Sequence, residues 1–252
     1  MELSKAKLSV YSSLSSAKMR RRHGLFIAEG EKAVADTLGS FEAVSVVKLR
    51  GAALGFDPGK AAVFETGEPE MKKISNLVTP SDVAGIFRLP EEEISLSADS
   101  GSLYLMLDGV RDPGNLGTMF RTAEAAGVTG ILMSRGTVDV FNPKTVRSTM
   151  SSVFRMPFVV TEDFHGALRE LQEKGIRLYA ACLQESRSYD KETYLGPCGF
   201  LVGNEGNGLA EETIRLADAR IHIPMEGSIE SLNAAMSAGI LMYEALRQRH
   251  LQ

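Results

Sequence analysis

The chain has 252 residues, of which 44% are apolar and 24% are charged, an ordinary composition for a globular protein. Its net charge of −4 excludes a protein that binds nucleic acid through overall charge, so any such contact must come from local basic patches. No apolar run approaches the ~18 residues of a membrane span, and no apolar segment of a secretory signal follows the basic N-terminus. Cys182 and Cys198 lack metal-ligand spacing, so we expect no metal site and a reducing, cytoplasmic setting.

The first part of the chain indicates a small α/β domain followed by a linker. Residues 1–23 are basic and are predicted to form an exposed helix or arm. Beyond them, β-branched runs predict strands and apolar residues at helical spacing predict helices. We expect strands at 25–28, 44–49, 61–65 and 83–89, and helices at 30–38 and 71–78. Residues 90–101 are acidic and then rich in serine, as in a linker, so the domain is expected to span residues 1–97.

The second part, residues 102–252, alternates predicted strands with predicted helices. The all-apolar run 103–107 is typical of a strand that is buried on both faces of a parallel sheet. Further strands are expected at 130–133, 158–160, 178–182, 199–202 and 221–223, and helices at 116–126, from 143, at 164–174, 209–217 and 232–249. This alternation predicts an α/β fold with a parallel sheet.

The loop 108–117 leaves a buried strand and enters a helix, a common place for a ligand site in α/β sheets. Asn115 lies near the start of that helix, where its plain structural role is that of a cap. Arg121 follows on the same helix, where a surface salt bridge is the plain interpretation.

The segment 201–209 also connects a strand to a helix. Its glycine pattern is G-x-x-G-x-G, which differs from a dinucleotide-binding fingerprint, and the chain has no phosphate-binding P-loop pattern. Glu205 has a plain interpretation as a charge favourable to a helix N-terminus. Gly203 would allow main-chain groups to approach a flat ring closely.

A third segment runs from the end of a strand at 223–225 to the start of the last helix at 231–233. Ser231 is suited to cap that helix. The four histidines, His23, His165, His222 and His250, are scattered, and we expect them to be structural or on the surface.

Together, the segments 115–123, 201–209 and 223–233 resemble the three signature motifs of the SpoU/TrmH family of S-adenosylmethionine-dependent RNA ribose 2′-O-methyltransferases. The resemblance covers about the last 150 residues and implies a SPOUT-type parallel sheet whose C-terminal segment forms a trefoil knot, a rare exception to unknotted folds. It implies that Arg121 is catalytic and that four more residues complete the reaction centre: Asn115, Glu205, Ser231 and Asn233. It further implies that S-adenosylmethionine is bound by Gly203, Ile223, Met225 and Leu232.

The reaction that this resemblance implies leaves the proton acceptor open. Positioning of a ribose hydroxyl against the methyl group supplies much of the acceleration. A guanidinium is an awkward base because it is effectively always protonated. Either the surroundings of Arg121 lower its pKa, or Arg121 orients an RNA phosphate oxygen that accepts the proton.

Two further segments resemble RNA-binding parts of the family. Residues 142–155 resemble the stretch before the middle strand, with Lys144, Arg147 and Arg155 as expected phosphate contacts. Ser151-Ser152 stands where relatives often have a glycine, and Ala234-Ala235 replaces a run that usually contains valine. Residues 20–30 resemble the start of a substrate-binding domain similar to ribosomal protein L30e, in which Arg20, Arg21 and Arg22 would contact phosphates and make binding salt-sensitive.

Members of this family are homodimers with the site near the interface. An apolar stripe on the last helix suits such an interface, or alternatively packs only on its own sheet: Leu232, Met236, Ile240, Tyr243 and Leu246. The L30e-like domain favours ribosomal RNA over transfer RNA as the substrate. Methylation of a base instead of a ribose, and a non-catalytic RNA-binding protein, are the remaining alternatives.

Overall fold

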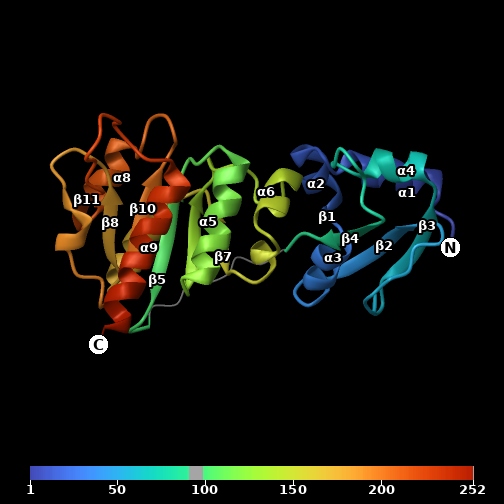
Figure 1. Ribbon diagram of the computed structural model, residues 1–252, viewed down its shortest axis with the longest axis horizontal. Helices are drawn as coiled ribbons and strands as arrows, with labels where there is room; N and C mark the ends of the chain where they lie inside the picture. Colours follow the sequence, from blue (N-terminus) through green and yellow to red (C-terminus); the bar gives the residue numbers. More distant parts are fainter. Residues whose placement is uncertain (91–98, 252) are drawn as a thin grey trace. The chain divides into compact units, whose positions relative to one another are not determined.

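The computed structural model describes residues 1–90 and 99–251 (Figure 1). Most of the predicted linker, residues 91–98, lies outside the described residues. The described chain forms two compact units, one of residues 1–90 with Asp139–Arg155, the other of residues 99–138 with 156–251. Residues 139–155 therefore pack with the first unit, although the sequence places them in the second domain. Within the described ranges, no helix has both the length and the apolar character that crossing a bilayer requires.

The first unit contains a four-stranded mixed sheet in the order β1-β4-β2-β3. The central strand β4 is antiparallel to both β1 and β2, whereas β2 and β3 are parallel. The strands are β1 (Leu25–Glu29), β2 (Ala43–Leu49), β3 (Ala62–Thr66) and β4 (Val83–Arg88). Each lies within a residue of its predicted position.

Residues 1–90 contribute four helices to this unit: α1 (Lys5–Ser13), α2 (Ala17–His23), α3 (Glu31–Leu38) and α4 (Glu68–Ile74). The basic N-terminal stretch is not an exposed arm, because Tyr11 and Leu14 are buried in a core that also contains Ile74. The helix predicted at 71–78 begins earlier, since Pro69 occupies the first turn, where its missing N–H costs nothing.

The segment 139–155 joins this unit through aromatic packing. It contains α6 (Pro143–Ser148), which is capped by the side chain of Asn142, and the short 3₁₀ helix η1 (Ser152–Phe154). The rings of Phe141 and Phe154 lie 4.5 and 6.1 Å from that of Phe26 on β1. Aromatic pairs at this spacing add to the stabilisation from burial.

The second unit contains a seven-stranded sheet in the order β7-β6-β5-β10-β8-β11-β9, with every pair parallel, which confirms the predicted parallel α/β fold. The strands are β5 (Leu103–Asp108), β6 (Gly130–Ser134), β7 (Phe158–Thr161), β8 (Arg177–Ala181), β9 (Arg187–Ser188), β10 (Cys198–Gly203) and β11 (Ala219–His222). The sequence did not predict β9, because two residues are too few for a periodic pattern.

The helices of this unit are α5 (Pro113–Ala125), α7 (Phe164–Glu173), α8 (Glu211–Leu216) and α9 (Ala234–His250), with the 3₁₀ turn η2 (Tyr189–Lys191). Tyr104 and Met106 of β5 point into a core shared with α7 and α8. Their neighbours in sequence point to the opposite face, because side chains alternate along a strand. Helices α5 and α9 lie side by side (Figure 1).

The strand order brings the first two signature segments together. Strands β5 and β10 are direct neighbours, in a register that pairs Asp108 with Gly203 at their carboxyl ends. The loops that follow these strands therefore leave the same edge of the sheet side by side. The predicted trefoil knot stays a prediction.

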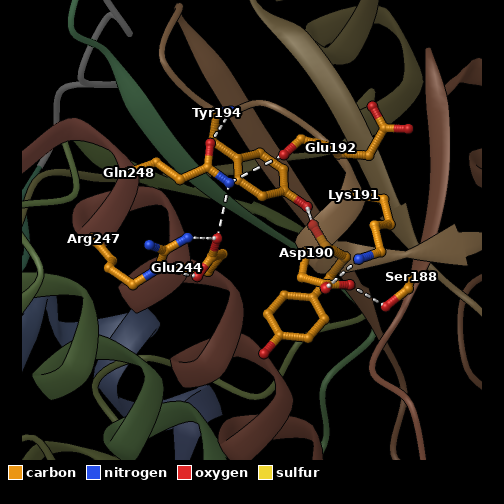
Figure 2. Close-up of polar contacts among 9 residues, drawn as sticks. Ser188, Asp190, Lys191, Glu192, Tyr194, Glu244, Arg247 and Gln248 are labelled. Atoms are coloured by element: carbon orange, nitrogen blue, oxygen red, sulfur yellow. Dashed lines mark hydrogen bonds and ion pairs between the residues drawn. The ribbon is translucent and has the colours of Figure 1, made fainter. Parts of the chain in front are cut away.

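The end of α9 is tied to the segment 188–198 by polar contacts (Figure 2). Gln248 accepts from the N–H of Tyr194 at 2.9 Å and donates to the carbonyl of Glu192 at 3.0 Å. Arg249 donates to the carbonyl oxygens of Tyr194, Gly101 and Gly196 at 2.7–2.9 Å. One guanidinium thus holds three chain segments together.

Replacement of Arg249 by alanine is expected to lower the free energy of unfolding by about 2–3 kcal/mol, because several charge-assisted hydrogen bonds are lost together. Urea denaturation followed by circular dichroism measures the change. Arg247→Ala is the matched control: its ion pair with Glu244 is solvent-exposed on the arginine side, and such pairs contribute about 1 kcal/mol or less. Equal effects of the two substitutions would contradict the role given to Arg249.

Candidate active site

The carboxylate of Glu205 is the centre of the polar cluster at this edge of the sheet. It accepts hydrogen bonds from the backbone N–H groups of Arg111 and Asp112, both at 3.1 Å, at the start of α5. The side-chain amide of Asn115 donates a third bond at 3.0 Å. An anion at a helix N-terminus is favourable, but the helix concerned is α5 and not α8, which follows Glu205 in sequence.

Asn115 has a different role from the structural one that its position suggested. Asp112 caps α5, since its carboxylate accepts from the N–H of Asn115 at 2.8 Å. The side chain of Asn115 is therefore left to bridge two other segments: it donates to Glu205 and accepts from the amide of Asn233 at 2.9 Å. All three signature segments are joined by this chain of hydrogen bonds.

Both the nitrogen and the oxygen of the Asn233 side-chain amide are hydrogen-bonded. Its oxygen accepts from the N–H groups of Ala235 and Met236, at 2.9 and 3.3 Å, so that Asn233 caps α9. Ser231 is consequently not the helix cap, and its hydroxyl makes no hydrogen bond to any described residue. The structural alternative proposed for Ser231 is wrong, and its hydroxyl stays available for a bound molecule.

The environment of Glu205 changes its ionisation. Burial by itself raises the pKa of this carboxyl, but the hydrogen bonds from Asn115 and from the backbone of Arg111 and Asp112 outweigh burial and lower the pKa below the ordinary 4.5. Glu205 is therefore held as a carboxylate.

Gly203 is required by the chain itself. A Cβ atom at this position would lie 2.2 Å from the carbonyl carbon of Gly208, far inside van der Waals contact. Asn204 and Gly208 exchange two backbone hydrogen bonds, which closes the loop between them into a tight turn. The backbone that approaches Gly203 closely is thus that of the returning loop, at Gly208 and Leu209.

The segment that follows β11 has free main-chain groups. From Pro224 to Leu232, no N–H or C=O group is hydrogen-bonded to another residue in the described part of the chain. Ile223, Met225 and Leu232 are each half-buried. A cofactor that is bound through backbone and apolar contacts fits such a segment, and the carboxylate of Glu205 suits a cationic sulfonium.

Arg121 is exposed on α5 and lies outside the Glu205 cluster. Its guanidinium has no hydrogen bond or ion pair with any residue in the described ranges, so the surface salt bridge that a helical arginine usually forms is absent there. This side chain is free to bind a ligand.

The predicted phosphate contacts divide into two groups. Arg21, Arg22, Lys144 and Arg147 are exposed. Arg155 is exposed as well, and its guanidinium lies 3.6 Å from the carboxylate of Asp36. Arg20 is only 1% exposed and donates to the carbonyls of Leu14 and Ser15 and to Asp139 at 2.6 Å. This burial excludes the phosphate contact predicted for Arg20.

A hydrogen-bond chain at the base of the site was missed from sequence. Thr213 on α8 is completely buried and donates to Asp108 at 2.6 Å. His165 on α7 lies 3.0 Å from the same hydroxyl and must donate to it, because the hydroxyl proton is already used. This chain ties α8 to the strand end from which the loop 109–112 leaves. The one feature of the sequence that could have indicated this chain is the position of Asp108 at the carboxyl end of a buried strand, where polar residues of a site often lie.

Replacement of Glu205 by glutamine should reduce stability most near neutral pH. The lowered folded-state pKa means that the carboxylate stabilises the native state above the unfolded value of 4.5, and that this contribution is lost as pH falls through the folded value. Urea unfolding from about pH 7 to about pH 3 should show the gap between wild type and variant shrinking with acidity. The exposed Glu226→Gln is the control, and a gap independent of pH would refute this account of Glu205.

Comparison with known proteins agrees with the motif resemblance. The model of the SpoU rRNA Methylase family matches residues 102–243. The 23S rRNA (guanosine(2553)-2'-O)-methyltransferase RlmP of Bacillus subtilis is 32% identical over 244 residues, which cover 94% of each chain. The mitochondrial rRNA methyltransferase 3 of Homo sapiens is 26% identical and matches 95% of this chain and 71% of its own length.

Solved structures share the fold over the whole chain. The AdoMet-bound rRNA methyltransferase of Sinorhizobium meliloti has a TM-score of 0.87 at 35% identity, covering 100% of this chain and 97% of its own. The SpoU methyltransferase AviRb of Streptomyces viridochromogenes has a TM-score of 0.90 at 23% identity, covering 98% of both chains, and shows the fold alone. Because the family model spans more than half of the sequence and the Bacillus relative aligns over nearly all of it, this chain belongs to the SpoU rRNA methylase family.

Proposed function

We propose that this protein transfers the methyl group of S-adenosylmethionine to a ribose 2′-hydroxyl of ribosomal RNA. The hydrogen-bond chain from Glu205 through Asn115 to Asn233 carries the proposal, because it joins the three segments that the family uses for this reaction. The Bacillus relative is named for 2′-O-methylation of 23S rRNA, and the Sinorhizobium structure contains AdoMet. With ribosomal RNA as the substrate, a cytoplasmic location is part of the proposal.

The cofactor would be held by the free main-chain groups of the segment 224–232 and by the apolar side chains of Ile223, Met225 and Leu232, beside the turn after Gly203. When bound, it supplies a methyl group on a sulfonium, which is transferred by in-line displacement. Glu205 places a negative charge at this edge, and Asn115 and Asn233 hold the loops rigid. The unbonded hydroxyl of Ser231 would face the reacting ribose.

Arg121 acts on the RNA in this proposal. Its exposed guanidinium has no ion-pair partner among the described residues, so its N–H donors are left to orient a phosphate oxygen that accepts the hydroxyl proton. Additional phosphate contacts would come from exposed cations of the first unit: Arg21, Arg22, Lys144 and Arg147. Arg155 would contribute after release from Asp36.

Dimerisation through α9 is supported by the exposure of its apolar stripe. The buried face of the helix consists of Ala235, Ala238, Leu241, Met242 and Ala245. The predicted stripe lies elsewhere: Met236 is 60% and Tyr243 48% exposed, and Ile240 and Leu246 are half-buried. The stripe therefore does not pack solely on its own sheet. A second copy is the partner that we propose, and α5, with Arg121, lies beside α9.

Methyl transfer from labelled S-adenosylmethionine into separated ribosomal and transfer RNA, taken from cells that lack this gene, tests the function. A 2′-O-methylated nucleoside from ribosomal RNA is expected. A methylated base would move the protein to a different reaction, and labelling of transfer RNA alone would change the substrate. If neither RNA is labelled and cofactor binding is also absent, the protein is a non-catalytic RNA binder.

Arg121→Ala is expected to lower methyl transfer by at least about 100-fold, the scale of a lost general acid–base or positioning group. Calorimetry should show cofactor affinity nearly unchanged, since Arg121 lies outside the segments proposed to hold the cofactor. Arg215→Ala removes a similarly exposed helical arginine of the same unit and should retain activity. Normal transfer by the Arg121 variant would reject its catalytic role.

Tyr243→Glu should convert the dimer to a monomer, because it buries a charge at the centre of the stripe. Sedimentation velocity at several protein concentrations measures the assembly. His250→Glu places the same charge on an exposed position near the end of α9, outside the stripe, and should leave the dimer intact. A wild-type protein that sediments as a monomer at all concentrations would disprove this interface.

A further inference from the structure

The first unit contains a cavity of about 620 Å³ that the motifs do not explain. Its walls come from the end of β1, the start of α3, the residues after α4, and α6 with the turn that follows it. Every residue around it belongs to the first unit, whereas all three signature segments belong to the second. No residue of the proposed reaction centre lines the cavity, and its volume is within the range of ligand pockets.

The charges at this cavity favour an anionic ligand. Two acids border it, but both are engaged within the protein: Glu29 accepts from Ser75 and from the backbone and side chain of Asn76, and Glu31 accepts from the N–H of Gly55. Lys32 and Arg147 also border it, are exposed, and have no side-chain partner among the described residues. With Lys144, three cations border the cavity against two carboxylates, so the charge around it is positive on balance.

The inner surface combines apolar walls with unused polar atoms. Ile27 and Val146 are buried, and Met150 is 59% exposed at the rim. Asn76 uses its amide nitrogen on Glu29, which leaves its side-chain oxygen as an acceptor. Asn142 uses its oxygen to cap α6, which leaves its amide nitrogen as a donor. A flat heterocycle with donors and acceptors on its edge matches such a lining.

We infer that this cavity receives one unstacked base of a single-stranded segment of the RNA substrate, with Lys32 and Arg147 against the neighbouring phosphates. Specific RNA recognition mostly uses bases that are splayed out of loops and bulges, whereas a base in a duplex is stacked on both faces and cannot enter a cavity. This inference rests on the proposed function. It assigns the anchoring of one RNA base to the first unit, whereas the residues proposed for methyl transfer belong to the second unit.

Binding of short fluorescein-labelled RNAs to the full-length protein tests the inference by fluorescence anisotropy. The probes are an oligouridine, an oligoadenosine and a duplex of equal length. Lys32→Ala combined with Arg147→Ala removes two of the three cations that border the cavity, and Ala33→Leu narrows the cavity from the start of α3. Lys72→Ala combined with Lys73→Ala is the matched control, because both lysines are exposed on α4 of the same unit and do not border the cavity.

Each cavity variant is expected to weaken single-strand binding about tenfold, the scale of one lost base contact, whereas the control changes it less than about twofold. The duplex should bind more weakly than the single strands, and a 4-thiouridine probe should cross-link to the peptide that contains Met150.

Wild-type binding of single strands by both cavity variants, or equal loss in the α4 control, would overturn the inference. A duplex that binds as well as the single strands would do so too, since surface charge alone would then suffice. Methyl transfer is measured in parallel on ribosomal RNA. Its absence counts against the proposed function, whereas the cavity is judged on oligonucleotide binding.

Discussion

The parallel pairing of β5 with β10 is the constraint on which the site depends. Its register sets Asp108 opposite Gly203, so the two loops leave the sheet together and Glu205 reaches the backbone N–H groups of Arg111 and Asp112, just before α5. Gly203 must lack a side chain because the returning loop occupies that space. Asn115 extends the contact to Asn233, which also starts α9. The positions of the segment 224–232, which we propose to hold the cofactor, and of the last helix thus follow from one strand pair.

The parallel sheet and the order of its elements were predictable because their signals are local. Apolar runs mark strands that are buried on both faces, and glycines such as Gly127 and Gly175 end helices with a positive φ. The resemblance placed Asn115, Glu205 and Asn233 in one site, where the structure joins them. Cap positions were less predictable, since Asp112 and Asn233 cap the helices for which Asn115 and Ser231 were equally plausible.

Contacts between residues that lie far apart in the sequence could not be predicted from the sequence. Arg20 stands in a run of three arginines that looks uniformly exposed, yet it is buried against Asp139, whereas Arg21 and Arg22 face solvent. No periodicity in so short a helix shows which of the three points inward. In the same way, residues 139–155 carry no pattern that reveals their packing on Phe26. The hydrogen bond of Thr213 to Asp108 could not be predicted either, because a single buried hydroxyl leaves no pattern in the sequence.

The turn at Met150 and Ser151 connects a departure from the family pattern to local strain. Both residues have left-handed φ angles, 50° and 72°, and Ser151 is buried. Such angles cost a residue with a side chain about 1–2 kcal/mol relative to glycine. The position where relatives often carry glycine is therefore one where glycine would relieve strain. Strained residues persist where the surroundings hold them, often at binding sites, and this turn borders the cavity of the first unit. The side chain of Met150, the other strained residue of this turn, forms the apolar rim of that cavity, so a strained backbone holds in place a side chain that the proposed base would contact.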